Sequence, residues 1–182
     1  MRELSLNILD IAQNSVRANA TMVDITVNCY RSLDLLEISI KDNGCGMSEE
    51  MVKSVIDPFT TTRTTRKVGM GIPLFKYSCE STGGSFEIKS KLAEGTTTCA
   101  RYVLSSIDRM PLGDLAGTIQ ILYTASANIN FRLFINTDDN NYEFSTAEAC
   151  EILGVDNLMD ADISYAVYGI LKDNIIELLK GV

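Results

Sequence analysis

The stretch ILDIAQNSVRANATMVDITVNCYRSLDLLEISIKDNGCGM, residues 8–47, decides the fold of this chain. Its first part belongs to a helix predicted over residues 3–19, because small and apolar residues recur at the helical period and share one side: Leu4, Ile8, Ile11, Ala12 and Ser15. Two strands follow, since apolar and polar residues alternate over residues 23–27 and 36–40. A helix followed directly by two alternating strands predicts a sheet with a helix packed on one face.

The remaining elements up to residue 105 extend this pattern. Ser48 is a candidate N-cap for a short helix, residues 57–71 show no period and are predicted to form a loop, and Gly83 and Gly84 end the next helix. The predicted elements are a helix over 48–56, a helix over 73–82 and two antiparallel strands over 85–90 and 96–104. This order predicts an α+β fold, a two-layer α/β sandwich whose mixed, mostly antiparallel sheet has its helices on one face.

The sequence changes character after Ser106. We expect a helix over 111–126, a hairpin over 129–145, a short capped helix to Leu153 and a last helix over 162–179. The apolar side of the last helix is predicted to contain Ile163, Ala166, Val167, Ile170 and Leu171. The chain is therefore divided into a domain over 1–105 and a small C-terminal α+β appendage over 107–182, which has no catalytic motif and is expected to contact a protein partner.

Composition narrows the function classes. The chain has 182 residues, 46% hydrophobic and 22% charged, and its net charge of −8 argues against nucleic acid as a partner. No stretch approaches membrane-spanning length and no signal peptide is recognised, so we expect no membrane association and a cytoplasmic location. The five cysteines lack CxxC spacing and the chain has no histidine, which argues against zinc and means that the chain cannot be its own histidine phosphoacceptor.

Asp42 is the most informative single residue. It continues the alternation of Leu36, Ile38 and Ile40, so its carboxylate is predicted to point to the buried side at the end of a strand. A buried carboxylate needs a partner, and the glycines that follow, Gly44 and Gly46, leave room for a flat ring beside the backbone. This arrangement suits recognition of the exocyclic amine of adenine; the alternative is a simple Asp-Asn-Gly hairpin turn.

Two further segments carry candidate phosphate ligands. Asp10, Asn14 and Arg17 form a polar row on the first helix: the Asn14 amide oxygen suits Mg²⁺, Arg17 can reach phosphate and Asp10 can orient a water. A solvated helix edge is the alternative. The loop over 57–71 adds hydroxyls, cations and glycines ahead of a helix N-terminus, with Thr62, Arg63, Lys67, Gly69 and Gly71 as candidates. A disordered polar linker is the alternative there.

Taken together, these motifs resemble the ATP-binding domain of the GHKL superfamily, which is shared by gyrase-type topoisomerases, Hsp90 chaperones, sensor histidine kinases and mismatch-repair ATPases. The resemblance covers about residues 1–105. The first motif is most similar to the mismatch-repair form, and residues 57–98 are more similar to the histidine-kinase form. The resemblance implies a site for ATP or ADP with Mg²⁺.

The resemblance also implies roles for single residues. Asn14 would be the magnesium ligand, Arg17 a phosphate contact and Asp42 the adenine anchor. The base would be lined by Gly44, Gly46 and Met47, the phosphates would be covered by Gly69 and Gly71, and Thr96 would support the adenine contact through water.

One departure from the family pattern bears on catalysis. Members that hydrolyse ATP carry glutamate where this chain has Asp10, and aspartate withdraws the carboxylate by about 1.5 Å. Because a displacement of about 1 Å can lower a rate on the order of 100-fold, we expect slow hydrolysis.

Three function hypotheses follow from the sequence. The first is an ATP/Mg²⁺-binding regulator of the histidine-kinase-like ATPase class in signal transduction, whose segment 57–71 orders on the γ-phosphate. The second is a serine or histidine protein kinase that acts on a partner protein, as anti-sigma-factor kinases of this superfamily do. The third is a non-catalytic interaction protein with a relic pocket. The oligomeric state stays open, with a homodimer among the alternatives.

Overall fold

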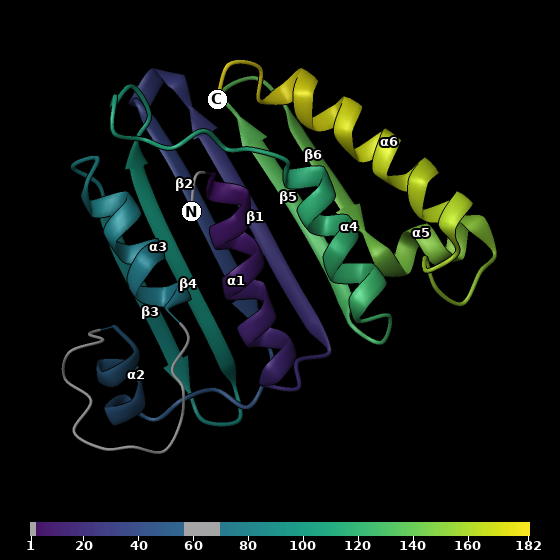
Figure 1. Ribbon diagram of the computed structural model, residues 1–182, viewed down its shortest axis with the longest axis horizontal. Helices are drawn as coiled ribbons and strands as arrows, with labels where there is room; N and C mark the ends of the chain where they lie inside the picture. The colour runs from purple at the N-terminus through teal and green to yellow at the C-terminus, as the bar shows by residue number, and fades with distance from the viewer. Residues whose placement is uncertain (1–2, 57–69) are drawn as a thin grey trace.

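The computed structural model describes residues 3–56 and 70–182, which form a six-stranded sheet with helices packed against it (Figure 1). The helices are α1 (Leu4–Arg17), α2 (Glu49–Ile56), α3 (Gly71–Glu80), α4 (Leu115–Ala125), α5 (Thr146–Leu153) and α6 (Ala161–Leu178). The strands are β1 (Met22–Tyr30), β2 (Leu35–Asp42), β3 (Ser85–Lys91), β4 (Gly95–Val103), β5 (Asn130–Thr137) and β6 (Asn141–Ser145), and a 3-10 turn, η1 (Arg31–Leu33), joins β1 to β2.

The sheet has the strand order β3-β4-β2-β1-β5-β6 and is mixed. Four of its strand pairs are antiparallel, and β1 with β5 is the parallel pair. Helices α1, α3 and α4 lie on the same face of this sheet (Figure 1). The predicted α+β fold, with a mostly antiparallel sheet and helices on one face, is therefore confirmed.

Alternation of side chains explains why β1 and β2 form the centre of the sheet. Val23, Ile25 and Val27 of β1 are buried beneath the helices, and the intervening residues are only half-buried. Ile25 pairs with Ile40 and Val27 with Ile38, so the buried positions of both strands lie on one face. This common face packs against the apolar side of α1 and forms the hydrophobic core.

The segment after Ser106 adds its strands to the same sheet. β5 runs parallel to β1, with Leu133 opposite Ile25 and Ile135 opposite Val27, and all four side chains are buried. The chain that leads into α4 also bonds to the start of α1, since the Leu4 amide donates to the Pro111 carbonyl at 3.0 Å. The predicted boundary near residue 106 thus falls between β4 and α4, while the sheet continues across it.

Two predicted helices differ from the observed ones. The helix predicted from residue 111 begins at Leu115, because the Asp114 carboxylate caps it by accepting from the Gly117 amide at 2.8 Å. In α6, Ala166 and Ile170 were expected on the apolar side, but both are exposed. They lie about 100° around the helix from the buried Val167 and Leu171, outside the stripe that packs on the protein.

The predicted loop over 57–71 lies outside the described residues except for its last two positions, Met70 and Gly71. Within the described ranges, 3–56 and 70–182, no helix has both the length and the apolar character that crossing a membrane requires.

The pairing of β5 with β1 predicts that the parts before and after residue 106 unfold together. Replacing the buried Ile135 with alanine leaves a cavity against β1, so Ile135→Ala is expected to lower the free energy of unfolding by about 2–5 kcal/mol. Hydrogen exchange read by NMR should show the loss of protection in β1 and β2 as well as in β5. Unchanged protection in β1 and β2 would contradict the prediction.

Candidate functional site

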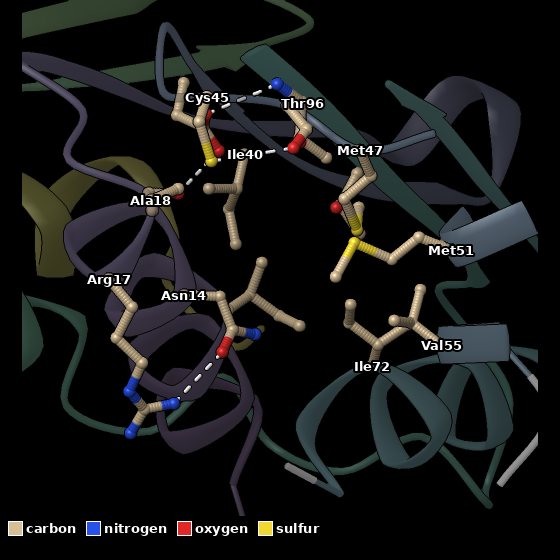
Figure 2. Close-up of a pocket in the computed structure, with 15 residues that line it drawn as sticks. Asn14, Arg17, Ala18, Ile40, Cys45, Met47, Met51, Val55, Ile72 and Thr96 are labelled. Atoms are coloured by element: carbon tan, nitrogen blue, oxygen red, sulfur yellow. Dashed lines mark hydrogen bonds between the residues drawn. The ribbon is translucent and has the colours of Figure 1, made fainter. Parts of the chain in front are cut away.

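A cavity of about 270 Å³ lies where α1, the end of β2, β4, α2 and α3 meet (Figure 2). Much of its wall is apolar and comes from Ile11, Ile40, Met47, Met51, Val55 and Ile72. Polar groups enter it at two places, the end of β2 with the facing start of β4, and the last turn of α1. A mostly apolar cleft with a few convergent polar groups is the usual form of a small-molecule site.

Asp42 occupies the end of β2 and is only 8% exposed. Its carboxylate accepts three hydrogen bonds: from the Ser15 hydroxyl at 2.8 Å, the Gly44 amide at 2.9 Å and the Thr96 amide at 3.3 Å. These donors hold the side chain at the cavity and compensate for its burial. The predicted inward orientation of Asp42 is therefore what the structure shows.

The two glycines after Asp42 are required by close backbone contacts. A Cβ at Gly44 would lie 2.7 Å from the Cβ of Ala18, so only glycine lets the turn approach α1 this closely. Gly46 has φ +65° and a Cβ there would lie 1.9 Å from the Lys91 carbonyl oxygen. The turn is therefore pressed between α1 and the β3–β4 hairpin, which sets the shape of the cavity floor.

Thr96 and Met47 complete the part of the wall around this turn. Thr96 stands opposite Asp42 in the β2–β4 register, and its hydroxyl lies 2.8 Å from the hydroxyl of Ser90. The Met47 amide donates to the same Ser90 hydroxyl at 2.8 Å. Ser90 does not line the cavity, but its hydroxyl links the glycine turn to β4 by hydrogen bonds to Met47 and Thr96.

The polar row of α1 divides between the cavity and its rim. Asn14 and Arg17 line the cavity, and the Arg17 guanidinium donates to the Asn14 amide oxygen at 3.1 Å (Figure 2). Asp10 is not among the lining residues. It lies beside the first residue of α3, since a Cβ at Gly71 would be 3.2 Å from the Asp10 Cβ and 3.8 Å from its Oδ2.

The structure thus brings together Asn14, Arg17, Asp42, Gly46, Met47 and Thr96 around one cavity, with Gly44 packed behind it. Gly71 stands at the start of α3, and the predicted candidates Thr62, Arg63, Lys67 and Gly69 lie outside the described residues. In the described part of the chain, no three His, Cys, Asp or Glu side chains gather in a way that could hold a metal ion. A cation here would depend on the Asn14 oxygen and on oxygens of its ligand.

Ser15, Met51 and Val55 are among the contributors to the site that the sequence analysis did not identify. Ser15 had been placed on the buried side of α1 without a role, although a hydroxyl in an apolar stripe signals a buried partner. Met51 and Val55 come from α2, which no pattern in the sequence linked to the cavity. Their contribution depends on the tertiary placement of α2.

Comparison with known proteins finds similarity over residues 2–105. The family model for histidine kinase-, DNA gyrase B- and HSP90-like ATPases matches residues 2–105. The chain is similar to the sensor protein kinase FleS of Pseudomonas aeruginosa, with 30% identity over 105 residues that make up 58% of this chain and 25% of FleS. It is also similar to the sensor protein SrrB of Staphylococcus aureus, with 33% identity over 102 residues, 53% of this chain and 17% of SrrB. The chain spans a quarter or less of these two relatives.

Solved structures show the same fold at low sequence identity. The ATPase domain of Aquifex aeolicus MutL, complexed with ADP, superposes with a TM-score of 0.53 and 13% identity over 85% of this chain and 70% of that one. The N-terminal domain of a DNA repair protein gives a TM-score of 0.54 and 13% identity over 80% of this chain and 52% of that one. Each superposition covers more of this chain than residues 1–106 make up, so the fold similarity extends into the C-terminal segment.

The hydrogen bond from Ser15 to Asp42 predicts a stability effect. Ser15→Ala removes a buried donor to a carboxylate, so the free energy of unfolding should fall by about 1.5–3 kcal/mol in urea denaturation. The matched control is Ser54→Ala on α2, where a more exposed hydroxyl donates within its own helix. The control should change stability by less than about 0.5 kcal/mol, and equal effects of the two variants would contradict the prediction.

Proposed function

The chain belongs to the family of histidine kinase-, DNA gyrase B- and HSP90-like ATPases, and from this premise we propose that it binds ATP with Mg²⁺ in the cavity beside Asp42. In this proposal the bound nucleotide sets the state of a regulatory protein in signal transduction, and ATP hydrolysis is slow. The observation that supports it best is the carboxylate of Asp42, which is buried, fixed by three donors and placed at the wall of an apolar cleft.

The Asp42 carboxylate suits adenine recognition. The Ser15 hydroxyl and the two backbone amides fix its orientation, and a carboxylate oxygen can accept more than one hydrogen bond. The exocyclic amine of adenine is a donor that fits this acceptor, and Met47, Ile40 and Ile72 offer apolar surface to the faces of the ring. Guanine carries a carbonyl at the corresponding position, and two acceptors facing each other repel.

The last turn of α1 suits the phosphates. Arg17 supplies a fixed positive charge at the cavity, and Asn14 supplies an amide oxygen, the kind of donor that Mg²⁺ prefers. When bound there, Mg²⁺ would neutralise charge on the phosphate oxygens. Gly71 and Asp10 lie together at the start of α3, where free backbone amides favour an anion.

A protein kinase acting on a partner is the second candidate. It is favoured by the match of residues 2–105 to a family model that includes histidine kinases, and by the similarity of the chain to FleS, which is named a sensor protein kinase. These 182 residues contain no histidine, so a histidine acceptor would have to lie outside them. Incubation with γ-labelled ATP distinguishes the two candidates, since release of free phosphate supports the ATPase and label on a partner supports the kinase.

The first prediction from the proposed function concerns nucleotide binding. ATP with Mg²⁺ at about 100 times its Kd should stabilise the folded protein by about 2.7 kcal/mol and raise Tm by about 5–10 °C, with a smaller rise for GTP. Asp42→Asn should weaken ATP binding at least about tenfold and reduce the difference between ATP and GTP, because the amide presents a donor as well as an acceptor. Differential scanning fluorimetry and calorimetric titration measure both effects.

Asp139→Asn serves as the control for this prediction, because that exposed carboxylate lies in the β5–β6 turn and is not among the residues that line the cavity. It should bind ATP as the unchanged protein does. The absence of any thermal shift with ATP and Mg²⁺ in the unchanged protein would refute the proposed function.

The second prediction concerns turnover. Asp10→Asn should keep ATP binding but abolish phosphate release, because the amide cannot take a proton from water. Asp10→Glu extends the side chain by one methylene and moves the carboxylate closer to the phosphates, so it should raise the rate of phosphate release at least about tenfold. Single-turnover assays with labelled ATP measure both rates. Phosphate release that is unchanged in Asp10→Asn would remove Asp10 from the mechanism.

A further inference from the structure

The negative charge of this protein is concentrated in its C-terminal segment. Residues 107–182 contain 4 of the lysines and arginines and 12 of the aspartates and glutamates, whereas residues 1–106 contain 12 of each. The whole net charge of −8 therefore comes from the segment that forms α4, β5, β6, α5 and α6. Such a field attracts a positively charged partner and repels an anionic membrane or nucleic acid.

Helix α6 presents apolar side chains on its outer side. Its buried side, with Val167, Leu171 and Ile175, belongs to the hydrophobic core, and the helix packs beside α4 over β5 and β6 (Figure 1). On the other side Tyr165 is 74% exposed, Ile170 61% and Ile176 56%. No element in the described part of the chain covers these three residues.

We define the outer face of α6 by the residues that share this side at helical spacing: Asp162, Tyr165, Ala166, Gly169, Ile170, Asp173, Ile176 and Glu177. It combines the three exposed apolar side chains with three carboxylates and contains no lysine or arginine. Lys172 lies nearby, but its ammonium is held 5.6 Å from the centre of the Tyr168 ring. Tyr165, Gly169 and Ile176 lie within about 40° of one another around the helix and form one line. The carboxylates of Asp162, Asp173 and Glu177 lie beside this line, and Ile170 lies beyond them. A partner that fits this face has apolar groups along the line and cations beside them.

Gly169 points independently to a close approach from outside. Glycine is among the poorest helix formers, yet it stands in the middle of the 18-residue α6. Nothing among the described residues requires it, since a Cβ built at Gly169 meets no atom of theirs within 4 Å and its backbone has no positive φ. Small residues on a helix surface let the backbone of a second helix come close, and Ala166 stands beside Gly169 on the same face.

We propose that the outer face of α6 binds a basic amphipathic helix of a partner protein. The apolar side of that helix packs on Tyr165 and Ile176, and its cations lie beside Asp162, Asp173 and Glu177. A second copy of this chain fits less well, because pairing two such faces brings carboxylates of like charge together. The proposal names the partner surface of the proposed regulator, but binding at α6 does not require that the nucleotide site functions.

The probe is an 18-residue synthetic peptide with leucine at helical spacing, lysine at the other positions and a fluorescent label. A scrambled peptide of the same composition, in which the helical period is lost, is its control. Fluorescence anisotropy with the full chain, without nucleotide and at about 0.15 M salt, should give at least about tenfold tighter binding of the amphipathic peptide. Equal affinities for both peptides would show attraction by charge alone and overturn the proposal.

Two double variants, one on α6 and one elsewhere, test whether the peptide binds at α6. Tyr165→Ser combined with Ile176→Ser should weaken peptide binding at least about tenfold, because it removes exposed apolar contacts without touching the core. Leu33→Ser combined with Ile107→Ser is the matched control, since these exposed apolar residues lie elsewhere, and it should leave the affinity unchanged. Equal losses in the two double variants would overturn the proposal, as would loss in the control alone.

Gly169→Ala gives a readout that a purely structural glycine would not give. It should raise Tm by about 2 °C, because alanine is the better helix former, and weaken peptide binding several-fold by holding the partner helix away. A stabilised variant with unchanged affinity overturns the proposed close approach. Sedimentation that shows a dimer of the unchanged protein, lost in the Tyr165 and Ile176 double variant, would assign the face to a second copy instead. The ATP thermal shift is unaffected by any of these outcomes, so failure here is distinct from failure of the proposed function.

Discussion

The hydrogen bonds to the buried carboxylate of Asp42 are the constraint on which the site depends. A carboxylate at the end of a central strand is costly to bury, and here donors from three different elements offset that cost: Ser15 of α1, the turn at Gly44 and Thr96 of β4. The same bonds fix where α1 and β4 stand relative to β2. The group suited to bind a purine and the group that locks the cavity walls together are therefore one side chain, and the shape of the pocket cannot change without disturbing its chemistry.

Helix α1 connects this site with the C-terminal segment. Its last turn carries Asn14 and Arg17 at the cavity, while the amides of its first turn donate to the carbonyls of Pro111 and Leu112 ahead of α4. Beyond these bonds α4 packs on α1, and α6 packs on α4. The cavity wall and α6 are therefore joined by contiguous packing through α1 and α4.

The sequence predicted most of what depends on local patterns. Alternation along β2 gave the inward direction of Asp42, and helical spacing gave α1 with Asn14 and Arg17 on one row, because both follow from backbone geometry alone. The role of Ser15 and the apolar wall from α2 depend on how distant elements pack, and no local period encodes that. Ile170 shows the same limit, because α6 buries only the side that faces α4, β5 and β6, and its apolar residues extend beyond that side. Residues of the predicted phosphate loop that lie outside the described part remain predictions.

The contact between Asp10 and Gly71 changes what the shorter acid means for hydrolysis. Aspartate sets its carboxylate back by about 1.5 Å relative to glutamate, which by itself would leave it too far from a water at the phosphates. Yet the Cβ that Gly71 lacks would stand only 3.2 Å from the Asp10 Cβ, so the start of α3 lies directly against this side chain. A short acid on α1 and a glycine on the facing turn of α3 together allow the two helices to lie close to each other. The close approach of α3 therefore offsets part of the reach that Asp10 lacks, so hydrolysis is expected to be slow but not absent, and the additional methylene of a glutamate supplies the remaining reach.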